Sequence, residues 1–484
     1  MRRIFLLSLI ASLSLVSFSQ TSVKGITLLI DFEDLPADLS VDRINDLLND
    51  EGYTEPAVPS SVRDYWKVQS RDSIDLTYDI FGYYRAAETF ATYETMDWTI
   101  VNDIVTAALD SVVANNPDYD WDGLTTHSAI GLENEILSVN VITTGWIPGS
   151  GGAHWSTDWT APNGYSLYGF TVQPLTSMWD PDFVRLFTIC HEIGHAAWGF
   201  PDTYDYDGSS FGTGFYSVMS GNQVAGEVEP IGAPFFRDAG WVDAIEIMPN
   251  SSYSLKQDGK SVAIYFNPAD DKEYFIIEAC MSSTPGNAAF PVERGLVIWH
   301  VDENVTTLNT LENMTFEEHY EYSIEQADGN FDLENGVNQG DAGDIYVEGS
   351  EFNSSTIPNT NWWNGDESGL DINSITFLAD NTIRFCNGEC SDLGLKTTLS
   401  KFQFTLYPTE NNGQFFIEIP DGLNDEELVF SISNSAGQIF QTIQSKPVKG
   451  QVEIALNEDY TGMIFISIKN ITGENYGVQK AVIR

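Results

Sequence analysis

The sequence predicts an α+β fold built from several domains, and three observations support this. Residues 25–32 are mostly apolar up to Ile30 and then reach Asp31, typical of a buried strand followed by an acidic turn. Residues 180–199 have helical periodicity with clear start and stop signals. From Pro249 onward, apolar and polar residues alternate between turns, as in β-structure. With 484 residues and 42% hydrophobic content, the chain can form about two to four domains with separate cores.

The N-terminus has the layout of a secretory signal peptide. Basic residues at Arg2 and Arg3 precede an apolar run over 4–18, and Ser17 and Ser19 occupy small-residue cleavage positions. This run is shorter than the roughly 18 residues that favour a membrane span. We therefore expect residues 1–19 to be removed and the mature chain to be exported, soluble and without a transmembrane segment.

The charge balance is strongly acidic. Asp and Glu number 71 against 22 Lys and Arg, a formal net charge of -49. Such a surface repels phosphate backbones, so nucleic acid is excluded as a partner. Divalent cations, basic substrates or a simple solvated surface remain compatible with it.

Further elements are predicted along the chain from periodicity and turn signals. The N-terminal region has a helix at 98–114 and strands at 70–78 and 135–143. The following region, from 249 to 394, is mostly β, and the last region, from 395 to 484, has short strands spaced as in a small β-sandwich. The clearest strands of these two regions are 272–278, 295–301, 402–407, 414–419, 427–433 and 463–468.

The helix at 180–199 is predicted from local signals alone. Asp180 suits the N-cap and Pro181 the first helical position. Gly199 suits the residue just past the end, and Pro201 blocks continuation.

On this helix, His191 and His195 are four residues apart and therefore project side by side. Two imidazoles so placed can bind one zinc ion. Glu192 lies beside the pair, where it can act as a general base toward water. The alternative is a chance His-Glu-x-x-His on an ordinary helix.

A catalytic zinc ion needs a third protein ligand. Asp202 is the predicted ligand, because a chain that turns back at Gly199 returns a carboxylate to the metal; Asp205, Asp207 and His154 remain alternatives. Two further candidates follow downstream in the sequence. They are Met219, in a predicted tight turn below the metal or in the core, and Tyr216, a possible oxyanion stabiliser on position alone.

Other motifs are less specific. Cys386 and Cys390 can close a small disulfide loop, whereas Cys190 falls in an apolar helical pattern and is predicted to be core. The run 118–123 opens like a calcium loop, but position twelve is Ala129, so an EF-hand is excluded. Structural calcium remains an expectation at 118–123, 328–332 and 341–344. No Gly-x-Ser-x-Gly motif supports serine hydrolase chemistry.

The chain resembles the immune inhibitor A family of secreted metallopeptidases over about residues 25–378. One departure is Trp198, which adds one residue between the second histidine and Gly199. The resemblance implies a zincin-type catalytic domain at 20–248, a β-rich companion lobe at 249–394, a zinc cofactor and protein or peptide substrates. The matching segments are 61–66, 81–84, 199–205, 273–278, 295–303 and 326–329.

The C-terminal region 395–484 resembles the sorting domain of the type IX secretion system. The similarity lies in 404–409, 412–416, 434–438, 461–465 and 480–484, with Tyr407-Pro-Thr-Glu410 in place of the usual Tyr-Pro-Asn-Pro. It implies passage through the outer-membrane secretion machinery, followed by release or attachment at the cell surface. The alternative is a carbohydrate- or protein-binding β-sandwich.

Together these features predict a secreted zinc endopeptidase. In this hypothesis His191, His195 and Asp202 bind zinc and Glu192 is the general base. An exported binding or adhesion protein without turnover is the main alternative, and a metal-dependent hydrolase of non-peptide bonds is a third.

Overall fold

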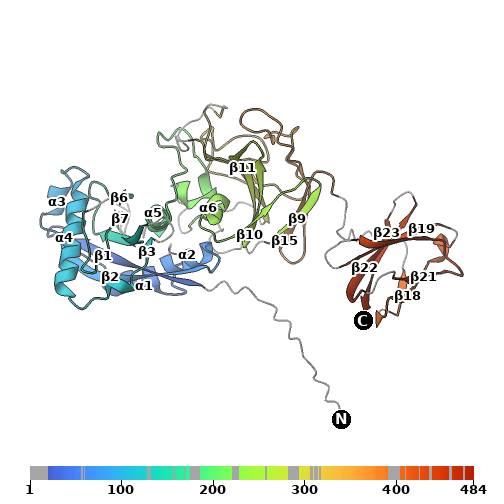
Figure 1. The fold of residues 1–484 in the computed structure, drawn as a ribbon. Coiled ribbons are helices and arrows are strands. Elements are labelled where there is room, and N and C mark those ends of the chain that lie inside the picture. Colours follow the sequence, from blue (N-terminus) through green and yellow to red (C-terminus); the bar gives the residue numbers. More distant parts are fainter. Residues whose placement is uncertain are drawn as a thin grey trace, which may run out of the picture. The chain divides into compact units, whose positions relative to one another are not determined.

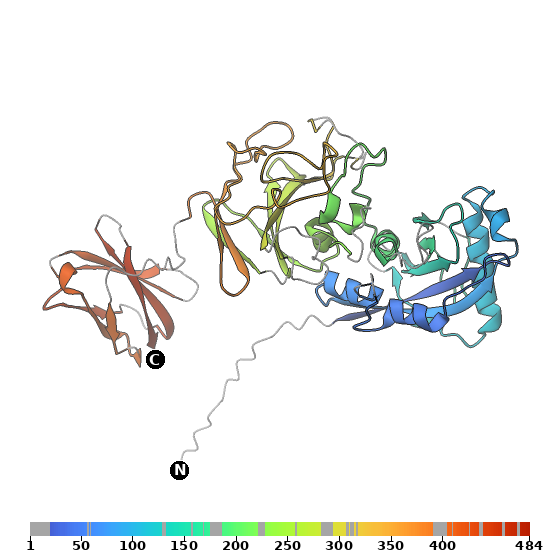
Figure 2. The same ribbon diagram turned by 180° about the vertical axis from the view of Figure 1, so that it is seen from behind.

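The structure is a computed structural model. It describes residues 20–55, 58, 60–127, 132–155, 158–167, 169–174, 186–220, 228–256, 259–281, 294–305, 309, 314–315, 318–390, 404–408, 410–424, 426–434, 439–456, 460–471 and 475–484. The predicted signal peptide lies outside these residues. The chain divides into two compact units, Met1–Cys390 and Ser391–Arg484 (Figures 1 and 2). The two lobes expected at 20–248 and 249–394 share the first unit up to Cys390.

Helices are few in these described ranges. The α-helices are α1 (Val41–Asn49), α2 (Val62–Gln69), α3 (Phe90–Tyr93), α4 (Ile100–Asn115), α5 (Leu186–Trp198) and α6 (Ala233–Asp238). The 3-10 helices are η1 (Trp121–Gly123), η2 (Gly214–Tyr216), η3 (Val218–Ser220) and η4 (Asp421–Leu423).

Strands make up most of the regular structure. In the first unit they are β1 (Thr21–Asp31), β2 (Ile74–Arg85), β3 (Thr126–His127), β4 (Leu132–Ile136), β5 (Val139–Thr143), β6 (Gly152–Trp155), β7 (Gly169–Pro174), β8 (Asp243–Glu246), β9 (Ser251–Lys256), β10 (Ser261–Asn267), β11 (Asp270–Met281), β12 (Arg294–Asp302), β13 (Tyr322–Ile324), β14 (Ile372–Phe377) and β15 (Thr382–Asn387). The second unit contains β16 (Thr405–Tyr407), β17 (Glu410–Asn411), β18 (Gln414–Glu418), β19 (Leu428–Asn434), β20 (Ile439–Ser445), β21 (Gln451–Ala455), β22 (Gly462–Asn470) and β23 (Asn475–Ile483).

The expected α+β class with a zincin-type catalytic domain is wrong. In the described residues, 23 strands in several sheets outnumber six α-helices, and two of those helices, α3 and α6, have only four and six residues. The prediction is wrong because one helix with clear start and stop signals stands out in the sequence, whereas the strands give weaker local signals. The hydrogen bonds that assemble sheets join strands far apart in the chain, and periodicity does not show them.

The first sheet has the order β2-β1-β5-β7-β6 and is parallel except for β6, which pairs antiparallel with β7. Successive side chains of β1 point to opposite faces. Val23 and Leu29 pack with α1, α2 and α5, whereas Ile26 and Leu28 pack with α4. Both faces are therefore covered, which explains the mostly apolar run of this strand.

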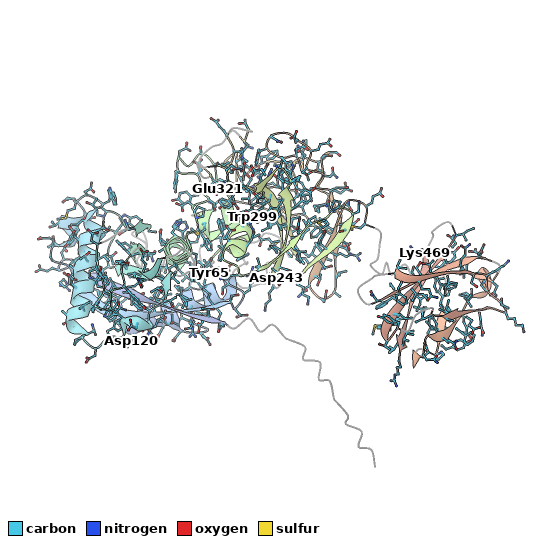
Figure 3. All side chains as sticks on the ribbon, viewed as in Figure 1. Tyr65, Asp120, Asp243, Trp299, Glu321 and Lys469 are labelled. Carbon is cyan, nitrogen blue, oxygen red and sulfur yellow. A yellow bond between two sulfur atoms is a disulfide. The ribbon has the colours of Figure 1, made fainter. Side chains whose placement is uncertain are left out.

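The second sheet, β13-β12-β11-β10-β8, continues the core that contains α5. One face of this sheet contributes Trp299 and Ile276 to that core, which also holds Tyr65 of α2 (Figure 3). The other face contributes Phe275 and Ile298 to a separate core with the three-stranded sheet β14-β15-β9. The helix with the two histidines is thus packed, through one core, against strands of both halves of the unit.

The C-terminal unit consists of two sheets, β16-β18-β21 and β17-β23-β22-β19-β20, around one core. Buried and exposed residues alternate along β18, as expected for a strand with one face in the core. Just before this unit, Cys386 and Cys390 form the predicted disulfide. Cys190 is a free, fully buried core residue, as predicted.

Several element predictions are confirmed and one is refined. The predicted helix at 98–114 is α4, and the predicted strands at 272–278 and 295–301 lie inside β11 and β12. The strand predicted at 135–143 is two strands, because β4 pairs with β3 while β5 joins β1 and β7. Among the helices described, none has the length and apolar character needed to cross a membrane.

Burial in the shared core predicts a large difference between two valines. Val297 on β12 is 1% exposed, whereas Val337 is 65% exposed. Val297→Ala should lower the free energy of unfolding by about 2–3 kcal/mol, because it removes buried methyl groups and leaves a cavity. Val337→Ala should change it by less than about 0.5 kcal/mol. Denaturant unfolding of the full chain measures both; equal effects would contradict the packing described here.

Candidate metal centre

Helix α5 is a core helix over most of its length. Every residue from Leu186 to Gly194 is buried, including the polar His191 and Glu192. Its predicted start at Asp180 and Pro181 lies outside the described residues. Burying an imidazole and a carboxylate costs free energy unless hydrogen bonds or opposite charges stabilise them. The groups around His191 and Glu192 therefore indicate the role of this part of the helix.

The helix ends at the predicted glycine. Gly199 has a φ of 72°, a left-handed conformation that favours glycine. The Gly199 amide donates to the His195 carbonyl (3.0 Å) and the Phe200 amide to the Gly194 carbonyl (3.1 Å). This tight reversal brings Asp202 back beside the helix, so the added Trp198 does not prevent the return.

Three side-chain atoms converge at this point. The Nε2 atoms of His191 and His195 lie 3.1 Å from each other. Oδ1 of Asp202 lies 3.1 Å from the first and 3.0 Å from the second. The structure therefore brings the two predicted histidines and the preferred third ligand together.

Backbone carbonyls fix the orientation of both imidazoles. Nδ1 of His191 is 2.8 Å from the carbonyl of Val218, and Nδ1 of His195 is 2.5 Å from the carbonyl of Phe200. A carbonyl oxygen only accepts, so each Nδ1 carries the proton. In the neutral rings, each Nε2 therefore presents a lone pair toward the other ring and toward Asp202, an arrangement typical of metal-binding histidines.

This donor set fits a zinc ion. Three lone-pair atoms that face one another repel unless a cation or a proton lies among them. A tetrahedral ion with ligands at about 2.0–2.1 Å separates its ligand atoms by about 3.3 Å. The observed separations of 3.0–3.1 Å are close to that value. Two imidazoles and one carboxylate leave a fourth position for water or substrate, as in catalytic zinc sites.

The pKa shifts of Asp202 and His191 are also consistent with a metal site. Burial opposes ionisation of Asp202, but its contacts with His191 and His195 outweigh burial and hold the pKa of this carboxyl well below its usual range. Burial likewise opposes protonation of His191, yet its contacts with Asp202 and the charge of Glu192 raise its pKa. Oδ1 of Asp202 lies next to these two histidines, and in the described part of the chain no Lys or Arg forms an ion pair with it.

Glu192 lies next to the ligands without belonging to them. Its side chain is 3% exposed, and its charge acts on both His191 and Tyr204. A buried carboxylate beside a metal-ligand set is well placed to take up a proton from water.

Met219 lies directly against the helix. Its sulfur occupies the space above Gly194, only 2.7 Å from where a Cβ on that glycine would stand. The Met219 carbonyl accepts from the Thr203 amide (2.8 Å), and the preceding Val218 carbonyl orients His191. The short segment η3 thus supports both the helix and the loop that carries Asp202.

Tyr216 is not placed as predicted. It is 1% exposed, and its hydroxyl donates to Asp344 (2.8 Å), which belongs to a different acidic cluster. Two tyrosines that sequence reasoning missed lie closer to the ligands. The Tyr206 hydroxyl donates to Oδ2 of Asp202 (2.7 Å), and the Tyr204 ring lies 6.2 Å from the His191 ring. The available signal was their place in the loop just after Asp202, in Asp202-Thr-Tyr-Asp-Tyr206.

The alternative third ligands serve other contacts. Asp205 accepts from the amides of Asp207 and Ser210, so it makes a turn. Asp207 accepts from Ser209 in the same turn. His154 on β6 contacts the Gly149 carbonyl (2.6 Å) and stacks on Phe170.

A second group of possible ligands lies in the 328–344 region. Carboxylate oxygens of Asp328, Asp341 and Asp344 lie within 4.8 Å of one another. Of the 118–123 run, Asp122 accepts from Asn163, and its predicted twelfth position lies outside the described residues. Structural calcium at these segments stays a prediction.

Comparison with known proteins adds one distant similarity. No protein-family model matches the chain. The chain is 28% identical over 261 residues to the Pre-pro-metalloprotease PrtV of two strains of Vibrio cholerae serotype O1. This match covers 42% of the chain and only 28% of the length of the relative. The chain is therefore distantly similar to a metalloprotease, which agrees with the metal-ligand set on α5.

The solved structures with partial similarity include that of PorZ, a bacterial surface component of the type IX secretion system of Porphyromonas gingivalis. The match covers 49% of this chain and 38% of PorZ at 10% identity, with a TM-score of 0.14. A score this low carries no conclusion about fold or function.

The metal-ligand set predicts a sharp difference between two aspartates of one loop. Removing a group that only hydrogen-bonds to a metal ligand typically weakens metal binding by about 10–100-fold. Asp202→Asn changes a candidate ligand itself, so it should weaken zinc binding by more than that. Asp207→Asn should bind zinc as the wild type does, because Asp207 is exposed and outside the set. Competition with a chromophoric chelator measures both affinities. Equal affinities of the two variants would show that Asp202 is not a ligand.

Proposed function

We propose that the chain is a secreted zinc-dependent endopeptidase that hydrolyses peptide bonds of extracellular proteins. The observation that carries this proposal is the convergence of His191, His195 and Asp202, at 3.0–3.1 Å from one another, beside the buried Glu192. The distant similarity to a metalloprotease supports the same class of chemistry.

In this proposal the two histidines and Asp202 hold zinc. The ion supplies Lewis acidity that activates water at neutral pH and polarises a carbonyl group. Glu192 takes the proton that water loses as its oxygen bonds to the peptide carbonyl carbon. It then returns that proton to the amine nitrogen as the C–N bond breaks.

Two tyrosines complete the proposed site. Tyr206 donates to Asp202 and so holds this carboxylate in place. Burial and the charges of Asp202 and Glu192 raise the pKa of Tyr204, so its phenol stays protonated and able to donate. Tyr204 is therefore a better candidate than Tyr216 for a donor to the substrate carbonyl oxygen.

Export and sorting are part of the proposal and rest on the sequence. The signal-peptide layout supports export, and the sorting-domain resemblance supports passage through outer-membrane secretion machinery. A separate compact unit at 391–484 is compatible with a sorting domain that acts apart from the site.

The general base gives the decisive test. Glu192→Gln keeps the size of the side chain but cannot accept a proton, so casein hydrolysis should fall by about 10²–10⁴-fold with zinc still bound. Glu348→Gln, at an exposed position, is the matched control and should retain full activity. If wild type and Glu192→Gln are equally inactive with zinc bound, the binding-protein alternative replaces the peptidase.

A further inference from the structure

A second site is built into the β-rich part of the first unit. A cavity of about 580 Å³ opens where β12 and β13 meet the segments 331–335 and 357–365. We call it the acidic pocket, and its polar lining includes His300, Ser323, Glu325, Glu334 and Asn361. Its volume is within the range of small-ligand sites in proteins.

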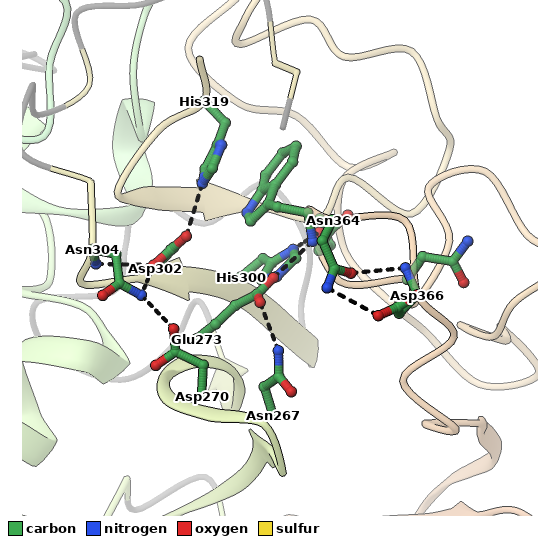
Figure 4. Close-up of polar contacts among 12 residues, drawn as sticks. Asn267, Asp270, Glu273, His300, Asp302, Asn304, His319, Asn364 and Asp366 are labelled. Carbon is green, nitrogen blue, oxygen red and sulfur yellow. Dashed lines mark hydrogen bonds and ion pairs between the residues drawn. The ribbon is translucent and has the colours of Figure 1, made fainter. Parts of the chain in front are cut away.

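The floor of the pocket is a buried charge network centred on His300, which is 2% exposed. Its Nε2 lies 3.1 Å from Glu273 and its Nδ1 3.2 Å from Glu325 (Figure 4 shows the Glu273 side). Glu273 also accepts from Asn267 (2.8 Å) and from the Trp363 amide (2.7 Å). Two carboxylates against one imidazolium leave one negative charge in excess at the floor.

The pocket wall adds a further carboxyl group. Glu334 is 9% exposed and accepts from Gln326 at 2.5 Å. Burial raises its pKa to about 7, and no Lys, Arg or His of the described residues forms an ion pair with it. Among the described residues, the lining contains no Lys or Arg. An anionic ligand is therefore disfavoured, whereas a bound cation would supply the missing counter-charge.

Two oxygen atoms around the cavity lack hydrogen-bond partners in the described residues. They are Oγ of Ser323 and Oδ1 of Asn361, and Ser323 is 3% exposed. Buried polar groups in folded proteins are nearly always paired. Both oxygens can accept a hydrogen bond, and ammonium and guanidinium groups carry donors only, so a basic side chain is the kind of group that suits them.

The rest of the lining suits a long side chain that ends in a charge. Apolar groups of Met314, Ile357 and Pro358 can contact a methylene stem. The exposed Phe331 offers aromatic surface to a cation, whereas the Trp363 ring is stacked on His300 and His319. This combination of an apolar rim and an acidic, acceptor-rich interior matches the side chains of arginine and lysine.

The pocket is connected to the loop that carries Asp202. Between the wall residues Phe331 and Glu334, the Leu333 carbonyl accepts from the Phe211 amide (2.9 Å). Asn309 donates to the Thr203 carbonyl (3.0 Å), one residue after Asp202. Hydrogen bonds therefore join the pocket wall and its neighbourhood to the segment that carries Asp202.

We propose that the acidic pocket binds the side chain of an arginine or lysine residue of a polypeptide and is a substrate-recognition site separate from the metal centre. Its role in recognition rests on the proposed peptidase function, whereas the binding itself does not.

The test measures binding without turnover, so it can fail independently of the peptidase proposal. Nα-acetyl-arginine methylamide, its lysine counterpart and Nα-acetyl-norleucine methylamide are titrated calorimetrically into the zinc-loaded full chain carrying Glu192→Gln. Both basic probes, or one of them, should bind at least about tenfold more tightly than norleucine, the size expected of a hydrogen-bonded charge.

Pocket variants then locate the site. Glu334→Gln, whose amide oxygen still accepts from Gln326, and Ser323→Ala should each weaken the preferred basic probe by about three- to tenfold. Glu348→Gln, which removes an exposed carboxylate elsewhere, should leave it unchanged. If one variant fails to fold, the other decides. Equal affinity for norleucine and the basic probes, or wild-type affinity in both pocket variants, would overturn the proposal.

Discussion

The candidate site depends on two backbone carbonyls that hold two imidazoles. Val218 and Phe200 each accept from an Nδ1 and thereby turn both Nε2 lone pairs toward Asp202. These carbonyls come from η3 and from the turn after α5, so the positions of three segments must agree within a few tenths of an ångström. An arrangement of lone-pair atoms this close is stable only with a cation or a proton among them, which makes metal binding the simplest explanation of the geometry.

This agreement is possible because α5 is packed inside one core. The core that holds the helix also includes strands β10, β11, β12 and β13, so both halves of the first unit fix its position. The same sheet carries His300 at the floor of the acidic pocket, and the pocket wall is hydrogen-bonded to the loop that follows Asp202. The metal centre and the pocket are thus supported by one continuous scaffold, which explains why so many polar groups are buried in it.

The candidate metal ligands were predictable from the sequence because they lie close together along the chain, whereas the fold class and the pocket were not. His191 and His195 are one helical turn apart. Gly199 indicates that the chain reverses direction just after the helix, and Asp202 follows within a few residues. By contrast, the dominance of strands depends on pairing between segments far apart in the chain. The same pairing brings His300, Glu325 and Asn361 to one cavity. Position in the sequence alone points to Tyr216, but its hydroxyl donates to Asp344, which is not part of the metal-ligand set.

The most direct test of the central claim is zinc K-edge X-ray absorption spectroscopy of the zinc-loaded full chain. The account predicts a shell of nitrogen and oxygen atoms at about 2.0–2.1 Å, with the scattering pattern of two imidazoles and no sulfur. In Asp202→Asn the imidazole pattern should persist while the shell loses an oxygen ligand or zinc is lost. A sulfur shell near 2.3 Å, or a single imidazole in the wild type, would contradict the ligand set on which the account rests.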